Sequence, residues 1–154
     1  MLRDTLVTSE ACLFLIKNVD SSLLFKSELF QRVLTAYYLG NNDLHLRNIG
    51  LLLPEKEAAR LSPIYDYVSI APYPDYIANE NSLALPLLAS EEGDNGNTSG
   101  HKSHCTYTGY DFLMFAEKFG IKPKLATKAD QCVVATKKRL LRRFIAIALC
   151  RKSK

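Results

Sequence analysis

The sequence predicts a mainly α-helical domain that carries one small β-hairpin. Apolar residues recur at three- and four-residue steps over 23–39 and again over 140–148, the spacing of amphipathic helices. Short apolar runs at 49–53 and 59–61 flank a turn at 54–57, and they predict the two strands of the hairpin. A length of 154 residues suits a single domain, 1–154, with a modest hydrophobic core.

The first two helices have clear start and stop signals. Thr8 or Ser9 is a candidate cap for a helix that runs to about residue 17, and Ser21 or Ser22 caps a second helix over 23–39. Gly40 ends that helix in the left-handed conformation that glycine favours. The second helix should bury one face, formed by Phe25, Leu29, Phe30, Val33, Leu34, Tyr37 and Tyr38.

The second half of the chain alternates loops and helices. Residues 71–81 are rich in Pro, Tyr and Asp and predict an ordered loop, whereas 89–103 have the polar, Gly-rich composition of a mobile loop. Thr108 should cap a helix over about 110–119 that stops at Gly120, and a last helix is predicted over about 128–150.

Composition favours a protein of the cytoplasm. No apolar run is long enough to span a bilayer, and the first residues lack the pattern of a secretory signal. The cysteines are widely spaced, which predicts free and mostly buried thiols; they are Cys12, Cys105, Cys132 and Cys150. His101, His104 and Cys105 cluster, but a structural zinc site needs a fourth ligand that no second cluster supplies, so a polar loop is favoured.

The candidate catalytic residues lie in two short segments after the second helix. Asp43 and Asn48 stand five positions apart, the spacing of the catalytic Asp and the metal-binding Asn in a kinase catalytic loop, and Asp66 follows the hairpin. Asp43 could accept the proton of a substrate hydroxyl, while Asn48 and Asp66 offer the hard oxygens that Mg²⁺ prefers. His45 or Arg47 could place a cation near the transferring phosphoryl group.

A plainer interpretation stands beside the catalytic one. The run Gly40-Asn41-Asn42-Asp43 is also ordinary turn chemistry, because Asn and Asp accept hydrogen bonds from the backbone two residues on. On that view the segment is only a loop between a helix and a strand.

The order of several segments resembles the HipA-like serine/threonine kinases, the toxin components of bacterial toxin–antitoxin systems. The resemblance covers about 23–122. It rests on Glu28-Leu29-Phe30-Gln31-Arg32-Val33-Leu34, Gly40-Asn41-Asn42-Asp43-Leu44-His45-Leu46-Arg47-Asn48, Leu61-Ser62-Pro63-Ile64-Tyr65-Asp66, Ser82-Leu83-Ala84-Leu85-Pro86-Leu87 and Tyr110-Asp111-Phe112-Leu113-Met114-Phe115-Ala116-Glu117-Lys118-Phe119-Gly120. Arg47 replaces the family's usual Lys.

The resemblance implies a helical domain like the C-terminal lobe of a kinase. It makes Asp43 the catalytic base and Asn48 and Asp66 the Mg²⁺ ligands, with ATP as phosphate donor and a protein hydroxyl as acceptor. It also implies a DNA-binding antitoxin as a partner.

The nucleotide-gripping half of such a kinase is not visible in this sequence. There is no glycine-rich phosphate loop with its flanking strand and helix, and about forty residues precede Asp43. ATP binding should therefore need an N-terminal half. The chain could be one domain of a larger protein, one product of a split gene that needs a partner chain, or a decayed remnant.

The basic end of the chain, 137–154, leaves three interpretations open. Lys137, Lys138, Arg139, Arg142, Arg143, Arg151, Lys152 and Lys154 follow the last acidic residue, Asp130. They can form a solvated helix face, contact nucleic acid, or lie on a membrane surface. A non-catalytic module that binds nucleic acid or a protein through this end is thus the alternative to a kinase.

Overall fold

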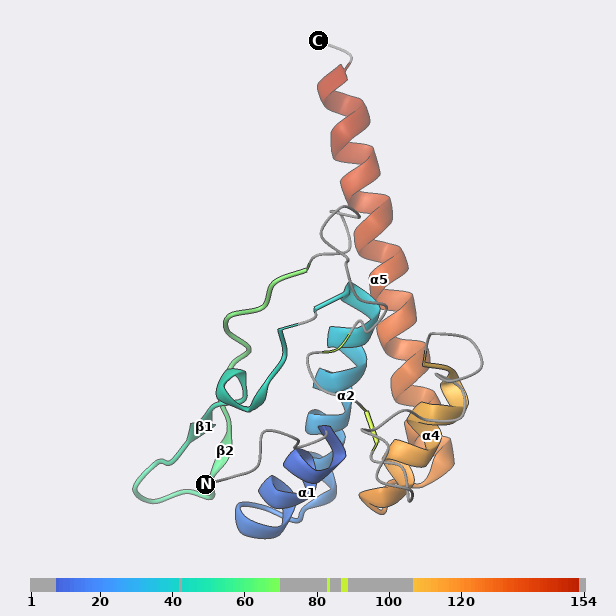
Figure 1. The fold of residues 1–154 in the computed structure, drawn as a ribbon. Coiled ribbons are helices and arrows are strands. Elements are labelled where there is room, and N and C mark those ends of the chain that lie inside the picture. Colours follow the sequence, from blue (N-terminus) through green and yellow to red (C-terminus); the bar gives the residue numbers. More distant parts are fainter. Residues whose placement is uncertain (1–7, 42, 70–82, 84–86, 89–106, 153–154) are drawn as a thin grey trace.

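The computed structural model describes residues 8–41, 43–69, 83, 87–88 and 107–152, and it confirms a mainly helical fold with one small hairpin (Figure 1). In chain order the elements are α1 (Thr8–Asn18), α2 (Leu23–Leu39), the 3-10 turn η1 (Leu46–Asn48), β1 (Leu51–Leu52), β2 (Arg60–Leu61), α4 (Gly109–Lys118) and α5 (Pro123–Lys152).

Helix α2 begins and ends as its sequence predicts. Of the two candidate caps, Ser22 is the one used, and its Oγ accepts a hydrogen bond from the N–H of Phe25 at 3.2 Å. Gly40 adopts φ 67°, ψ 39°, and its N–H donates to the carbonyl of Tyr37. The left-handed turn at Gly40 sends the chain directly into the candidate catalytic loop.

Helix α2 forms the centre of the core. It packs against α5 along its length, and Figure 1 shows α1 and α4 near its N-terminal half. Phe30 stacks on Phe115 of α4 with ring centroids 6.0 Å apart, and both side chains are fully buried. Full burial of a large apolar side chain contributes about 1.5–3 kcal/mol. The predicted buried face is therefore correct, with Tyr37 and Tyr38 partly buried at its end.

The last helix is longer than predicted. It begins at Pro123, not near residue 128, because proline suits the first helical position, where no N–H is needed. Gly120, at φ 70°, separates it from α4. Tyr38 Oη donates to Asp130 Oδ1 at 2.6 Å and ties α2 to α5.

The hairpin is shorter than predicted but has the expected pairing. Leu51 pairs with Leu61 and Leu52 with Arg60 in antiparallel register. The two strands bring the segment after β2 back toward the start of β1, which places it beside the loop that follows α2 (Figure 1).

Several predictions fall on residues outside the described part of the chain. These are the loops at 71–81 and 89–103 and the cluster of His101, His104 and Cys105. Cys12 is buried, and burial raises the pKa of its thiol to about 12, whereas Cys132 is exposed. No helix within the described ranges is long and apolar enough to cross a membrane.

Candidate functional site

The candidate catalytic loop starts from a buried asparagine. Asn41 is fully buried, and its N–H donates to the carbonyl of Ala36 at 2.8 Å. Its Oδ1 accepts the N–H of Asp43 at 2.9 Å, a side-chain turn that asparagine makes readily. The turn chemistry noted in the sequence is therefore present, and its effect is to fix the backbone of Asp43 to the end of α2.

The same loop joins Asp43 to Asn48. The carbonyl of Asp43 accepts the N–H of His45 at 2.9 Å and Nδ2 of Asn48 at 2.7 Å. The N–H of Asn48 donates to the carbonyl of His45 at 2.9 Å and closes η1. Asn48 is buried, and its amide nitrogen is engaged, so its Oδ1 is the atom left to bind a ligand.

The carboxylate of Asp43 faces solvent. Its side chain is 52% exposed, and its Oδ1 lies 3.7 Å from Nε2 of His45. The His45 ring is partly buried, and its Nδ1 is enclosed without a hydrogen bond to any described residue. Arg47 is exposed. The loop thus presents an ionisable oxygen with an imidazole beside it.

The segment with Asp66 is held next to this loop. The N–H of Ser62 donates to the carbonyl of Gly50 at 2.9 Å, and Tyr65 Oη donates to the carbonyl of Arg47 at 2.7 Å. Asp66 follows with φ 50°, a left-handed conformation that Asp tolerates better than most residues. The carboxylate of Asp66 is on an exposed residue one position from a side chain anchored to the loop.

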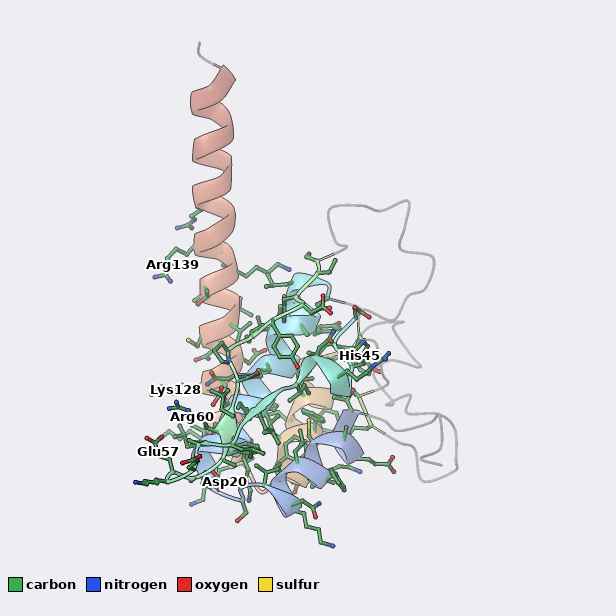
Figure 2. The ribbon with its side chains drawn as sticks, turned by 90° about the vertical axis from the view of Figure 1, so that its left-hand side faces the viewer. Asp20, His45, Glu57, Arg60, Lys128 and Arg139 are labelled. Carbon is green, nitrogen blue, oxygen red and sulfur yellow. The ribbon has the colours of Figure 1, made fainter. Side chains whose placement is uncertain are left out.

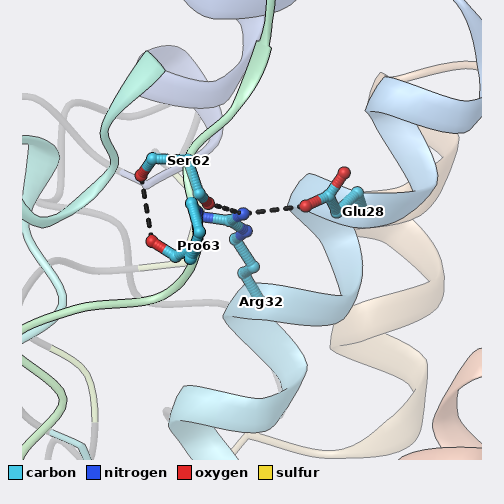
Figure 3. Close-up of polar contacts among 4 residues, drawn as sticks. All are labelled: Glu28, Arg32, Ser62 and Pro63. Atoms are coloured by element: carbon cyan, nitrogen blue, oxygen red, sulfur yellow. Dashed lines mark hydrogen bonds and ion pairs between the residues drawn. The ribbon is translucent and has the colours of Figure 1, made fainter. Parts of the chain in front are cut away.

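A buried arginine supports the same segment, and sequence analysis assigned it no role. Arg32 in α2 is 6% exposed, and its Nη2 donates both to Glu28 Oε1, at 2.7 Å, and to the carbonyl of Ser62 (Figure 3). A signal for this burial exists in the sequence. Position 32 lies three residues after Leu29 and four before Ala36, on the apolar face of the helix.

Few protein ligands are available for a cation here. Within the part of the chain that the structure describes, no group of three or more His, Cys, Asp or Glu side chains could hold a metal ion. An amide oxygen from Asn48 and a carboxylate from Asp66 fit a Mg²⁺ ion that keeps waters and binds phosphate oxygens. They do not fit a closed structural metal site, which needs a full set of protein ligands.

The site and the basic helix lie on different sides of the molecule. Figure 2 shows His45 on one side of the view and Lys128 and Arg139 of α5 on the other. The exposed pair Glu57 and Arg60, at the hairpin, also lies away from His45. The loop chemistry and the charge of α5 therefore belong to separate surfaces.

Comparison with known proteins places this fold and loop in one family. The model of the family described as HipA-like C-terminal domain matches residues 4–141, so the chain belongs to that family. A Haemophilus influenzae protein named "Putative kinase" is 44% identical over 109 residues, which are 70% of this chain and 32% of that protein. A Sinorhizobium fredii protein named "Putative kinase Y4dM" is 33% identical over 70 residues, 46% of this chain and 16% of that protein. The aligned part is thus about a third or less of either relative's length.

Proposed function

We propose that this chain is the C-terminal catalytic lobe of a HipA-related protein serine/threonine kinase that transfers the γ-phosphate of ATP to a protein hydroxyl. One observation carries the proposal: Asn48 Nδ2 donates to the carbonyl of Asp43 at 2.7 Å, while the Asp43 carboxylate stays exposed. A base and a metal ligand at kinase spacing are thereby locked into one turn. The names of the two relatives point to the same activity.

Each polar residue of the loop and of the segment after the hairpin has its own role in the proposed reaction. Asp43 accepts the proton of the attacking hydroxyl, and His45, 3.7 Å away, shapes the field around that carboxylate. Asn48 Oδ1 and Asp66 would hold Mg²⁺, which neutralises charge on the phosphates when bound. Arg47 is a cation available to the transferring phosphoryl group.

The grip on ATP belongs to another part of the protein in this proposal. The aligned relatives extend well beyond the matched residues, and the described residues offer no glycine-rich phosphate loop. An N-terminal half, on the same chain or on a partner chain, supplies the ATP-binding residues. The complete kinase acts in the cytoplasm in this proposal. A protein substrate and a DNA-binding antitoxin are the partners that follow from the toxin–antitoxin resemblance.

The decisive experiment replaces Asp43 in the complete kinase. Asp43→Asn should lower phosphate transfer by about 10²- to 10⁴-fold, the usual contribution of a positioned base. Melting temperature should not change, since the carboxylate is exposed and its backbone contacts remain. Glu57→Gln, an exposed carboxylate of the hairpin region, is the matched control and should keep full activity. Equal activities of the two variants would overturn the proposal.

A second candidate function rests on α5. Figure 1 shows its C-terminal half projecting beyond the other described elements. This helix also carries the excess of basic residues. A non-catalytic module that contacts nucleic acid through this end would use such a projection.

A further inference from the structure

We infer that Arg32, oriented by Glu28, is a positioning residue that holds the Asp66 segment in the geometry required for the divalent cation. The inference rests on the proposed function, because it assigns a role at the same metal site. It concerns a residue of the helical core that does not reach the substrate, nucleotide or cation itself.

The contact network shows what Arg32 holds. Its Nη2 reaches from the middle of α2 across to the carbonyl of Ser62, thirty positions along the chain (Figure 3). Ser62 is the first residue after β2, and its N–H is already used by the carbonyl of Gly50. Both backbone groups of Ser62 are therefore fixed, one by the hairpin and one by the core.

The far end of the segment is fixed separately. Tyr65 Oη binds the carbonyl of Arg47, so the four-residue stretch between Ser62 and Tyr65 has an anchor at each end. Asp66 comes next, with φ 50°. Among the described residues, the Asp66 carboxylate makes no hydrogen bond or ion pair of its own. Its position therefore depends on the backbone that the two anchors hold.

Burial explains why the arginine is suited to this work. The Arg32 side chain is 7% exposed, and a buried charge is costly unless it is paired and hydrogen-bonded. Glu28 is 45% exposed and supplies the compensating carboxylate one helical turn away. The pair stays together in the folded state, and its only long-range hydrogen bond among the described residues goes to Ser62. Burying a charged side chain in an apolar helix face costs free energy. The hydrogen bond to the Ser62 carbonyl is the long-range contact that this buried charge makes among the described residues.

The experiment measures cation binding by the full chain with Mn²⁺, a paramagnetic substitute for Mg²⁺ that broadens nearby amide signals. In the wild type, the amides of Asn48 and Asp66 should broaden together as Mn²⁺ is added. Arg32→Met should weaken the Mn²⁺ affinity by about tenfold, the loss typical of residues that orient metal ligands. The Asp66 signal should also broaden less than that of Asn48. A merely structural role would change both signals alike.

Two more variants protect the test against a folding defect. Arg32→Lys keeps a cation that can reach the Ser62 carbonyl and should recover part of the affinity. Glu28→Gln keeps a hydrogen-bond acceptor on a half-exposed side chain, and it should fold and give a smaller loss in the same direction. If Arg32→Met does not fold, these two variants decide the matter.

Arg60 provides the matched control. It lies two residues before Ser62, its side chain is 64% exposed, and its Nη1 is 4.0 Å from Glu57 Oε2. Arg60→Met removes an arginine with an acidic neighbour in the same hairpin, and Mn²⁺ binding should not change.

The outcomes separate the two proposals. Asp66→Asn should weaken Mn²⁺ binding whether or not Arg32 matters. If Asp66→Asn weakens binding and Arg32→Met does not, the role of Arg32 is wrong and the metal site survives. If Asp66→Asn has no effect, the proposed metal site itself is wrong.

Discussion

At the scale of single residues, polar side chains of the site hold the main chain of the loop by hydrogen bonds. The carboxylates of the proposed chemistry are not used for this. Asn41, Asn48 and Tyr65 each use a polar group to hold a neighbouring main-chain atom. The carboxylates of Asp43 and Asp66 take no part in this scaffold. The proposed chemistry can therefore be removed by substitution at the two aspartates without dismantling the loop.

Gly50 gives a prediction at this scale. A Cβ added to Gly50 would lie 2.7 Å from Ser62 Oγ and 2.9 Å from Cε1 of Tyr65, both too close to tolerate. Gly50→Ala should push the Tyr65 ring away and break its bond to the Arg47 carbonyl, at a cost of about 1–3 kcal/mol. Urea unfolding and Mn²⁺ titration of the full chain would show reduced stability and weaker cation binding.

Gly109 is the control for that substitution. An added Cβ there meets nothing within 4 Å, and the residue is the first of α4. Gly109→Ala should leave stability and Mn²⁺ binding unchanged or slightly raise stability. If Gly50→Ala behaved like Gly109→Ala, the Tyr65 ring would have room to move, and its anchoring role would be refuted.

At the scale of elements, α2 and α5 form the frame on which the loop is built. The two helices are tied by the hydrogen bond from Tyr38 Oη to Asp130 Oδ1, and Lys137 Nζ lies 6.0 Å from the centroid of the Tyr38 ring. Burial of the Tyr38 hydroxyl, together with the nearby Asp130 carboxylate, raises the pKa of Tyr38 above its ordinary value of 10.0. Ionisation of this tyrosine thus opposes folding.

Removing the hydroxyl should have two effects. Tyr38→Phe should lower the free energy of unfolding at pH 7 by about 1–2 kcal/mol, because Asp130 loses its partner. The raised pKa stabilises the fold fully below pH 10, and the wild type should lose that stability as pH rises above 10. The variant should lose less over the same range, although Tyr67 and Tyr107, whose pKa values burial also raises, keep part of the dependence.

Urea titrations at pH 7 and above pH 10 would measure both effects. Tyr110→Phe is the control, since Tyr110 is 65% exposed, and its removal should not alter either value. Equal behaviour of the two variants would show that the Tyr38–Asp130 bond contributes nothing to the α2–α5 contact.

The elements were predictable where local signals and tertiary packing agree. The apolar spacing in α2, the cap at Ser22 and the stop at Gly40 all specify the same helix. The start of α5 was misplaced because Pro123 can either break a helix or begin one, and sequence spacing alone does not decide. The apolar runs predicted longer strands than the structure contains, since only Leu51 with Leu61 and Leu52 with Arg60 pair.

The candidate site was predictable only in part. Asp43, Asn48 and Asp66 carry residue types and spacing that indicate their chemistry. The bonds from Arg32 to Ser62 and from Tyr65 to Arg47 join residues far apart in sequence, and no local pattern encodes them. Their detection needs the relative placement of α2, the hairpin and the loop, which only the folded chain supplies.

At the scale of the whole molecule, the basic helix and the proposed catalytic loop lie apart. Helix α5, about 45 Å long at 1.5 Å per residue, carries Lys128 and Arg139 on the side of the molecule away from His45 (Figure 2). The family match ends at residue 141, within this helix. The end of α5 therefore follows the matched residues in sequence, and it projects past the other described elements in space (Figure 1).

A truncation tests whether this end has a function of its own. Arg143, Arg151, Lys152 and Lys154 follow Arg142, and together they equal the whole formal net charge of +4. A chain ending at Arg142 is formally neutral. If this end contacts nucleic acid, the full chain should bind duplex DNA with an affinity that falls steeply with salt, and the truncated chain should lose most of that affinity.

The truncated chain should keep its fold and its cation site. Among the side chains that the structure describes, those of α5 that contact the core are Leu125, Ala126, Ala129 and Val133, all before the cut. Melting temperature and Mn²⁺ binding should therefore match those of the full chain. DNA binding that survives the truncation would place the contact elsewhere. If neither chain bound DNA, the interpretation of the basic end as a DNA contact would be wrong, and a solvated face or a membrane-surface helix would be left. Loss of Mn²⁺ binding on truncation would contradict the separation of the two surfaces.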